Sequence, residues 1–465
     1  MRRAPPSEVM LLKVRSRHPA NPRGRDGAAR PSILLGIFTA VVLALPTLAF
    51  FASNVLLGRY VPALGAVALA GFLPLLALLA KDIRPEPRQP AIALTVVGLL
   101  VAPLVLSVGL HATSYSAADL VLGLSRIGAV TLYLVLAAVI AMHPGRDRLL
   151  AIALPTLAVM FAGLFLLAAL VFTHWHWGRL KPANLHPNWW GEVLVAVTLG
   201  ACFIRVRALR YGLQVLALVA IVMVQSRSAL LAAFPLTLMS IWLRETPRRV
   251  ILAAVVLFLL VAPPLLALDL VVAERSRVMA GVDFVANSVL LLNDPYRGLD
   301  TGAGQRIEGW LVALELGWAN PVAGVGFGRV SPVVAAETGK GLHNGHLMLL
   351  VDLGIVLYGV VLVVMLATLV AGLRHDRLIF TTMLFGFVLV MFVQPRAINA
   401  NVMSMLAWMS LVFIWLLPRD GPAAAVPSSA AAGGARLGER WRRTALAPTA
   451  VSSRSASIAG KPSHP

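Results

Sequence analysis

The chain has few charged residues for its length. Only 13% of its 465 residues are Asp, Glu, Lys or Arg, whereas 59% are hydrophobic and the mean hydropathy is +0.83. A soluble globular domain carries about 25% charged residues, so this composition excludes an ordinary soluble fold. The apolar residues recur in runs of about 20, the length that a helix needs to cross about 30 Å of hydrocarbon. The sequence therefore predicts an all-α polytopic membrane protein.

Cysteine and acidic residues are also scarce. Cys202 is the single cysteine and lies within an apolar run, which excludes an intramolecular disulfide and a cysteine-rich metal site. The 20 acidic residues stand against 40 Lys and Arg residues, which gives a formal net charge of +20. The basic residues lie in the tails and in short loops between apolar runs, a distribution that is typical of membrane orientation. We therefore predict membrane lipids, and no nucleic acid, as partners.

About twelve apolar runs are predicted to be membrane helices, nine within 31–268 and three within 343–417. These runs cover residues 31–52, 60–80, 90–110, 120–142, 149–172, 189–204, 211–225, 228–243, 249–268, 346–372, 377–393 and 402–417. Residues 1–30 form a basic tail without a convincing small-residue cleavage site, so we expect the first helix to stay uncleaved. Residues 418–465 are rich in Ala, Ser, Gly, Pro and Arg and are expected to form a disordered tail.

The charges of the connecting loops predict one orientation for all these helices. If both termini are cytoplasmic, 28 Lys and Arg residues fall inside, and six fall in short outside segments. This asymmetry follows the positive-inside rule. The inside loops are then residues 81–88, 143–148, 205–210, 244–249 and 374–377.

The same orientation leaves one long segment, residues 269–342, on the outer face. Long connections in compact proteins usually carry function. Within this segment an apolar stripe recurs at helical spacing, with Glu308 and Glu315 on another side. The stripe consists of Ile307, Trp310, Leu311, Leu314 and Trp318. We therefore predict an amphipathic helix that lies along the outer membrane surface.

Polar residues gather where this segment returns to the membrane. His343 and His346 are three residues apart, but no third and fourth ligand with a recognisable spacing stands nearby, so we predict no metal site. These polar residues also have a purely structural interpretation. Asn344 or His343 would cap the amino terminus of the tenth helix, and His346 would reach out to water.

Three arginines are expected at the same membrane depth as these histidines. Arg227 lies at the outer end of the eighth run, Arg306 at the start of the predicted surface helix, and Arg396 in the last outer turn. Each arginine alone is explained by anchoring at the membrane interface. Together with His343 they predict a pocket for a negatively charged group at the level of the outer headgroups.

Two further features argue against a nucleotide-binding loop and against a proton-driven transporter. The segment "GVGFG", residues 324–328, has none of the strand context of a nucleotide-binding loop, so it predicts close backbone packing or exposed amides. The few ionisable residues within the predicted helices, Asp119, Glu192, Asp269 and Asp352, lie near helix ends or one or two turns in. A proton-driven transporter normally has charges near mid-membrane, so this pattern disfavours one.

Four stretches occur in the order of a known family. "HPNWWGEVL", "SRSALLA", "RIEGWLVALELGWANPVAGVGFG" and "HNGHLMLLVDLGIVLYG" fall between about residues 180 and 400. With the long outer loop, they resemble the O-antigen ligase and Wzy-type polymerase superfamily of bacterial surface-polysaccharide enzymes. The ligase pattern is a His, then Asn, Ser or Gln, nine residues, Gly, and a small or polar residue three positions on. His343, Asn344 and Gly354 match it, whereas Leu357 stands where Gly, Thr or Tyr is expected.

This resemblance implies a GT-C-like fold in the bacterial inner membrane and a metal-independent, inverting glycosyl transfer on its outer face. The glycan would arrive on undecaprenyl diphosphate, and no cofactor is implied. Arg306 and Arg227 would bind the diphosphate, because bidentate Arg contacts suit phosphate groups. His343 would take the proton of the acceptor hydroxyl. Further substrate-binding residues are expected at Arg396, Asn344 and His346.

The identity of the acceptor distinguishes a ligase from a polymerase. A ligase would move the glycan to an acceptor such as lipid A core, whereas a polymerase would extend one lipid-linked chain of O-antigen or exopolysaccharide with another. The departure at Leu357 keeps the polymerase open beside the ligase. A transporter without catalysis would instead predict a continuous polar path or a twofold repeat, and the sequence shows neither.

Overall fold

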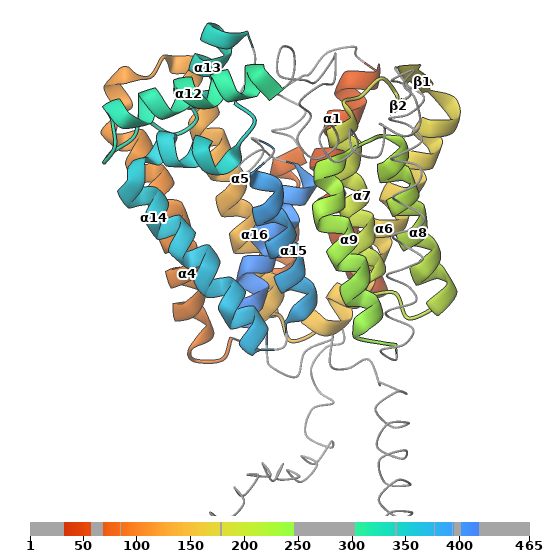
Figure 1. The fold of residues 1–465 in the computed structure, drawn as a ribbon. Coiled ribbons are helices and arrows are strands. Elements are labelled where there is room, and N and C mark those ends of the chain that lie inside the picture. Colours follow the sequence, from red (N-terminus) through yellow and green to blue (C-terminus); the bar gives the residue numbers. More distant parts are fainter. Residues whose placement is uncertain are drawn as a thin grey trace, which may run out of the picture.

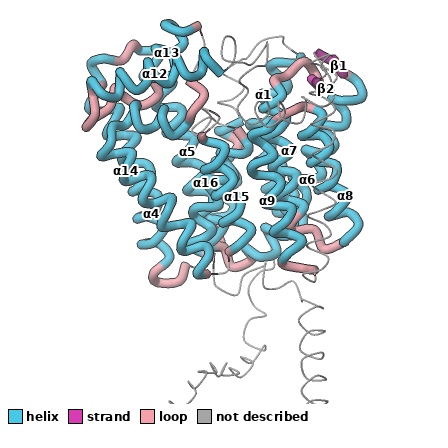
Figure 2. The backbone as a smooth tube through the Cα atoms, viewed as in Figure 1, coloured by secondary structure: helices cyan, strands magenta, loops and turns pink. Residues whose placement is uncertain are grey.

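The computed structural model is a bundle of helices with a small hairpin at one end (Figures 1 and 2). It describes residues 32–56, 68–83, 85–176, 179–245, 303–339, 342–375, 377–392, 394 and 401–417. The side chains of residues 56, 173–179, 227 and 303–307 are outside this description. The helices are α1 (Ile33–Leu56), α3 (Phe72–Ala80), α4 (Gln89–Leu110), η2 (Ala112–Ser114), α5 (Ala117–Met142), α6 (Arg146–Val171), α7 (Pro187–Ala201), α8 (Arg207–Met223), α9 (Arg227–Trp242), α12 (Ala303–Ala319), α13 (Val330–Thr338), α14 (Gly345–Arg374), α15 (Leu378–Met391) and α16 (Val402–Leu416).

The prediction of an all-α membrane protein is confirmed. Five helices are long and apolar enough to cross a membrane, namely α1, α4, α5, α6 and α14. Large apolar side chains cover the outside of the bundle, among them Leu170, which is 83% exposed. In water such a surface would be unfavourable, whereas lipid tails solvate it.

Helices occupy eleven of the twelve predicted runs, and the remaining run, 249–268, lies outside the described residues. Several of them are short. Helices α7, α9, α15 and α16 have 14 to 16 residues, fewer than the roughly 20 that span a bilayer upright. The number of twelve crossings therefore stays a prediction. The tails, 1–30 and 418–465, also lie outside the described residues.

A hairpin that the sequence did not predict connects α6 to α7. Strands β1 (Thr173–His176) and β2 (Arg179–Pro182) pair antiparallel, with Thr173 opposite Pro182. The indole Nε1 of the buried Trp190 in α7 donates a hydrogen bond to Pro182 O at 2.8 Å. This bond fixes the hairpin to the start of α7.

The loops that were predicted to share one face gather at one end of the bundle, the lower end in Figure 1. We call the end that carries α12 and α13 the α12–α13 end, and the end with these loops the opposite end. At the opposite end the carbonyls of the last residue of α16 and of its C-cap are satisfied by Arg377, from one of these loops, and by Gln89, the first residue of α4. Arg377 Nη2 donates to Leu417 O at 2.9 Å, and Gln89 Nε2 donates to Leu416 O at 3.2 Å. A cation at a helix carboxyl terminus also opposes the negative end of the helix dipole.

Small residues allow the central helices to approach closely. A Cβ atom added at Gly386 of α15 would lie 2.7 Å from the Cα atom of Ala232 in α9. A Cβ atom added at Gly191 of α7 would overlap Ser226, directly before α9. Small residues at helix crossings let backbones pack tightly in membranes. This packing places α9 directly against the middle of α15 and against the start of α7.

Candidate functional site

The start of α14 holds His343 in a defined place. Asn344 is the N-cap, and its Oδ1 accepts a hydrogen bond from Leu347 N at 2.9 Å, so the predicted capping role is confirmed. On the other side of His343, Leu342 is buried in a small apolar cluster with residues of α12, α13 and α14. The cluster consists of Leu342, Ala313, Val330, Val334, Met348 and Val351. The half-buried His343 is therefore positioned by both of its neighbours.

His346 does not reach water, so the expectation that it would do so is wrong. Its side chain is only 8% exposed and lies between α14 and α15. Nδ1 is 2.9 Å from the hydroxyl oxygen of Tyr358, and Nε2 is 3.0 Å from Val388 O. The imidazole ring also packs on Phe392, with ring centres 4.4 Å apart. Through Nε2, His346 thus connects α14 to α15, while Nδ1 makes a contact within α14. Its predicted contact with substrate stays a prediction.

Helix α14 breaks in its third turn, at Gly354. This residue has φ 74° and ψ 168°, a conformation that is essentially restricted to glycine. The connection between α12 and α13 packs into this break. Its backbone groups form hydrogen bonds with the backbone groups of α14 that a continuous helix would pair internally. Ile355 N donates to Pro321 O at 2.8 Å, and Gly326 N donates to Asp352 O at 3.0 Å. The break is therefore a built feature, with its backbone groups paired.

The loop that fills the break is the "GVGFG" segment, residues 324–328, which we call the glycine loop. Gly324, Gly326 and Gly328 all have positive φ, at 70°, 103° and 86°. A Cβ atom added at Gly324 would lie 2.5 Å from the carbonyl oxygen of Asp352. The predicted close backbone packing of these glycines is thus confirmed, and its partner is α14.

Asp352 fastens the glycine loop to α14. Its carboxylate is fully buried, and both oxygens accept backbone hydrogen bonds at 2.9 Å, Oδ2 from Gly328 N and Oδ1 from Val330 N. Its carbonyl also accepts a hydrogen bond from Ser107 Oγ of α4 at 3.1 Å. A buried carboxylate is tolerated only when it is hydrogen-bonded in this way. We call Asp352, Gly354 and the glycine loop together the α14 clasp.

The connection between α4 and α5 holds the glycine loop from its other side. The hydroxyl of Tyr115 donates to Phe327 O at 2.8 Å. Burial raises the pKa of Tyr115 to about 12, so the phenol keeps its proton and remains a donor near neutral pH. The guanidinium of Arg329 lies 5.4 Å from the centre of the Tyr115 ring, within the range of a cation–π contact.

The predicted amphipathic helix is confirmed as α12, which lies at the upper left of Figure 1. Its buried face includes Ala313, which packs in the apolar cluster at the start of α14. Glu308 and Glu315 are exposed beside an exposed apolar stripe of Leu311, Leu314 and Trp318. That this stripe lies on the membrane stays a prediction, as does the extent of the long outer segment, because residues 269–302 are outside the described chain.

The structure gives partial positions for the three predicted arginines. Arg227 is the first residue of α9, and Arg306 lies in the first turn of α12, but the description covers neither side chain. Arg396 lies outside the described residues. Directly after Arg227, Ser228 Oγ accepts a hydrogen bond from Gln394 Nε2, at the end of α15.

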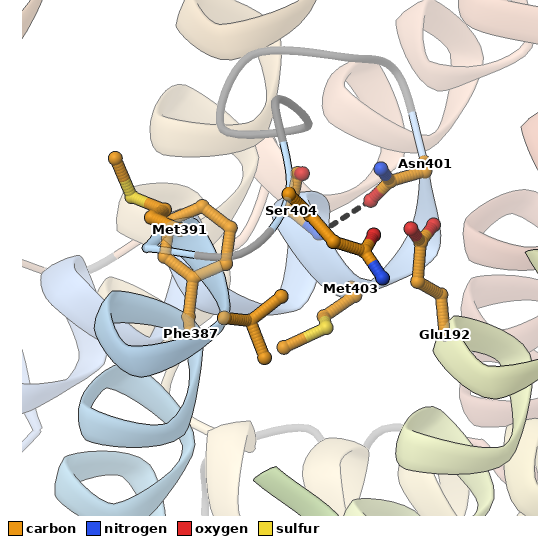
Figure 3. Close-up of a pocket in the computed structure, with 8 residues that line it drawn as sticks. Glu192, Phe387, Met391, Asn401, Met403 and Ser404 are labelled. Atoms are coloured by element: carbon orange, nitrogen blue, oxygen red, sulfur yellow. Dashed lines mark hydrogen bonds between the residues drawn. The ribbon is translucent and has the colours of Figure 1, made fainter. Parts of the chain in front are cut away.

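A pocket lies next to this bond, at the end of α15 (Figure 3). It is small, and it is lined by Glu192, Phe387, Val390, Met391, Gln394, Asn401, Met403 and Ser404. Asn401 caps α16, since its Oδ1 accepts from Ser404 N at 2.7 Å. Sequence reasoning noted Glu192 only as an ionisable residue and did not single out Gln394. The feature that could have identified both residues is their position in the sequence, because they are expected at the same membrane depth as Arg227 and Arg396.

A comparison with protein-family models gave a match in this part of the chain. Residues 212–362 match the family model Wzy_C, described as O-antigen ligase. The matched region includes α9, α12, the α14 clasp and His343. Among the described residues, no three His, Cys, Asp or Glu side chains come together as metal ligands would. The search of curated proteins gave no match. The match, over residues 212–362 of the 465, supports the resemblance to the O-antigen ligase and Wzy-type polymerase superfamily.

Proposed function

We propose that this protein transfers a glycan from undecaprenyl diphosphate to an acceptor hydroxyl, such as that of lipid A core, on the outer face of the bacterial inner membrane. The observation that supports this proposal most is the placement of His343. It lies between the buried Leu342 and the N-cap Asn344, at the start of α14 and within the family match.

The charge of the donor suits the α12–α13 end of the bundle. Helices α9 and α12 begin at this end and carry Arg227 and Arg306 in their first turns. The amino terminus of a helix favours anions through its dipole and its backbone amides. Bidentate Arg contacts add to this and stabilise the charge that grows on the diphosphate as the glycosyl bond breaks.

The proposed step is a direct displacement. The acceptor oxygen attacks the anomeric carbon, the bond to the diphosphate oxygen breaks, and its electron pair leaves on the diphosphate. The proton of the acceptor passes to His343, since general base catalysis contributes about 10²- to 10⁴-fold in such reactions. The anomeric centre is inverted, and the step requires no metal and no cofactor.

A Wzy-type polymerase is the second candidate, because Leu357 stands where the ligase pattern has a small or polar residue. It would use the same chemistry with a lipid-linked repeat unit as the acceptor. The difference between the two reactions therefore lies in the product.

The test is product analysis in proteoliposomes that contain the purified protein and glycan-bearing undecaprenyl diphosphate. Lipid A core and unextended lipid-linked repeat units are both offered, and the products are resolved by size. Glycan on lipid A core is the expected result, and it should persist in EDTA. A lengthening ladder on the carrier would make the protein a polymerase. Movement of intact donor between leaflets, without any new product, would contradict glycosyl transfer.

Arg306→Ala tests the diphosphate contact in the same assay. We expect it to reduce transfer by about 10²-fold or more, the usual loss when a donor to a developing anion is removed. Arg374→Ala is the matched control, because Arg374 is exposed in the last turn of α14, at the opposite end. Equal activity of the two variants would remove Arg306 from the proposed site.

A further inference from the structure

Helix α5 carries an arginine whose hydrogen-bond donors are unused. Arg126 and Asp119 are the only charged residues of this apolar helix, and the Asp119 carboxylate accepts a hydrogen bond from Ser116 Oγ at 2.6 Å in the first turn. Arg126 lies about 14 Å further along the helix axis. It is half-buried, and its guanidinium makes no hydrogen bond and no ion pair with any described residue. An unpaired charge within a membrane helix is costly, so it indicates a ligand.

The glycine loop holds this guanidinium in place. A Cβ atom added at Gly328 would lie 3.1 Å from Arg126 Nη1, so the guanidinium lies against the loop where a larger residue would extend. The two segments also touch one turn earlier in α5, where a Cβ atom added at Gly123 would lie 3.6 Å from Phe327 O. Arg126 is therefore positioned by the packing of α5 on the α14 clasp.

Asp352 attracts Arg126 but does not use its donors. Both oxygens of this fully buried carboxylate already accept backbone hydrogen bonds, and the two side chains form no ion pair. A guanidinium has five N–H donors in a planar fork that suits phosphate oxygens. Leu122, one turn earlier on nearly the same side of α5, is 43% exposed, so this side of the helix is open to lipid. A phosphate group from the headgroup layer is therefore the anion that fits.

This phosphate differs from the reacting diphosphate of the donor. Gly328, beside Arg126, donates to Asp352, and Asp352 lies nine residues after His343, about 14 Å along α14. Reacting atoms lie about 3–3.5 Å apart in a productive complex. The diphosphate that leaves the donor therefore lies beside His343 and not at Arg126.

We propose that Arg126 binds a phosphate group of a second membrane lipid, other than the undecaprenyl carrier. Two sources share this chemistry. One is the lipid A part of the acceptor, and the other is an anionic phospholipid of the surrounding leaflet. The inference rests on the proposed function in one respect, since it takes the reacting diphosphate to be the one beside His343.

Binding measurements on the purified full-length protein test the site without turnover. The probes are lipid A core, the same lipid after removal of its phosphate groups, phosphatidylglycerol, and bare undecaprenyl diphosphate. We expect Arg126→Gln to weaken binding of lipid A core or of phosphatidylglycerol by about tenfold or more, the loss of a charge-assisted hydrogen bond. Binding of the dephosphorylated lipid and of the bare carrier should not change. The lipid that binds more weakly is the source of the phosphate.

Two results would overturn the inference. One is unchanged binding of both phosphate-bearing lipids, which would limit Arg126 to a structural contact with the clasp. The other is an equal loss for the bare carrier, which would assign Arg126 to the donor site. Arg374→Gln is the matched control, because Arg374 is exposed in the last turn of α14, at the opposite end.

A second variant separates binding from folding. Arg126→Lys keeps the positive charge without the planar fork, so we expect it to lose less affinity than Arg126→Gln. The thermal midpoint of each variant checks that it is folded. If binding of a phosphate-bearing lipid depends on Arg126 in a protein that transfers nothing, the proposed function fails while the site stands.

Discussion

Asp352 shows how a single carboxylate can connect the segments around a site. Its two oxygens are matched to the backbone amides of Gly328 and Val330, so the α12–α13 connection is fastened to α14 through one side chain. His343 lies nine residues earlier in the chain and depends on the same contact between α12, α13 and α14.

Asp352→Asn should loosen this connection. The new amide group can accept one of the two hydrogen bonds, but its NH₂ would face the other backbone N–H. We expect a loss of about 1–3 kcal/mol in stability, as for other buried groups left unsatisfied, together with weaker transfer. Thermal unfolding in detergent measures the first effect. Asp119→Asn, an exposed residue near the start of α5, is the control, and equal midpoints for both variants would contradict the role of Asp352.

His143, after α5, should make stability depend on pH. Its Nδ1 accepts a hydrogen bond from Gly145 N at 3.0 Å, and burial lowers its pKa, an effect that the nearby Asp82 carboxylate partly opposes. The unfolded chain therefore binds a proton at a higher pH than the folded protein. Stability should decrease as the pH falls below about 6.5, towards the lower pKa of the folded state.

The measurement for His143 is the thermal midpoint at pH 7.5 and at pH 5.5. We expect a larger decrease in the wild type than in His143→Asn, whose amide oxygen can accept the same hydrogen bond and does not titrate. Parallel decreases in the two proteins would contradict this account.

Single-residue roles could be predicted only where their partners are local. The capping role of Asn344 follows from its place before an apolar run, because the group that it caps is three residues away. The burial of His346 could not be predicted in the same way. Its partner Val388 is 42 residues away, so the contact depends on how α14 and α15 pack.

At the scale of elements, the α14 clasp is the feature that most affects the site. The glycines of residues 324–328 predicted close packing, but the sequence did not indicate its partner. Gly354 lies within an apolar run that reads as one continuous helix, and only the structure shows its non-helical backbone. The clasp also gives a physical reason for the glycine of the ligase pattern, since the conformation at Gly354 is one that other residues rarely adopt.

Gly354→Ala should disrupt the clasp. Besides the strained φ, the added Cβ atom would lie 2.6 Å from Gly324 N. We expect a loss of stability of about 1–3 kcal/mol or more and loss of most transfer activity. Gly359→Ala is the matched control in the same helix, because nothing lies within 4 Å of its added Cβ atom. Equal behaviour of the two variants, measured by unfolding and by transfer rate, would contradict the role of the break.

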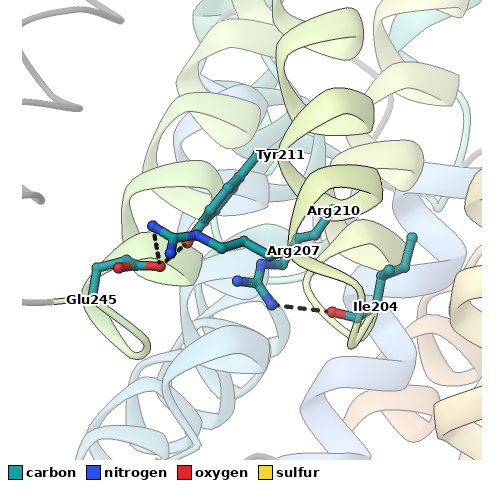
Figure 4. A network of polar contacts seen from close by, with 5 residues as sticks. All are labelled: Ile204, Arg207, Arg210, Tyr211 and Glu245. Carbon is teal, nitrogen blue, oxygen red and sulfur yellow. Dashed lines mark hydrogen bonds and ion pairs between the residues drawn. The ribbon is translucent and has the colours of Figure 1, made fainter. Parts of the chain in front are cut away.

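At the scale of the whole molecule, the distribution of charge predicted the arrangement well. The basic loops gather at the opposite end, where some of their side chains bind residues that follow α7 and α9 (Figure 4). Arg207 pairs with Glu245 at 3.1 Å, and Tyr211 donates to the same carboxylate at 2.9 Å. Arg210 donates to Ile204 O at 3.2 Å. Hydropathy and loop charge predict such an arrangement because lipid and water sort residues over the whole chain. They carry no information on which residues meet inside the bundle, so the pocket at Glu192 was not predicted.

The central claim is that glycosyl transfer takes place at the α12–α13 end with His343 as the base. The most direct measurement compares the transfer rates of His343→Ala and His375→Ala in the same proteoliposomes. His375 follows the last turn of α14, so the two variants remove the same side chain from the two ends of one helix. We predict that His343→Ala loses at least about 10²-fold in rate, while His375→Ala stays near the wild type. Full activity of a folded His343→Ala protein would contradict the account.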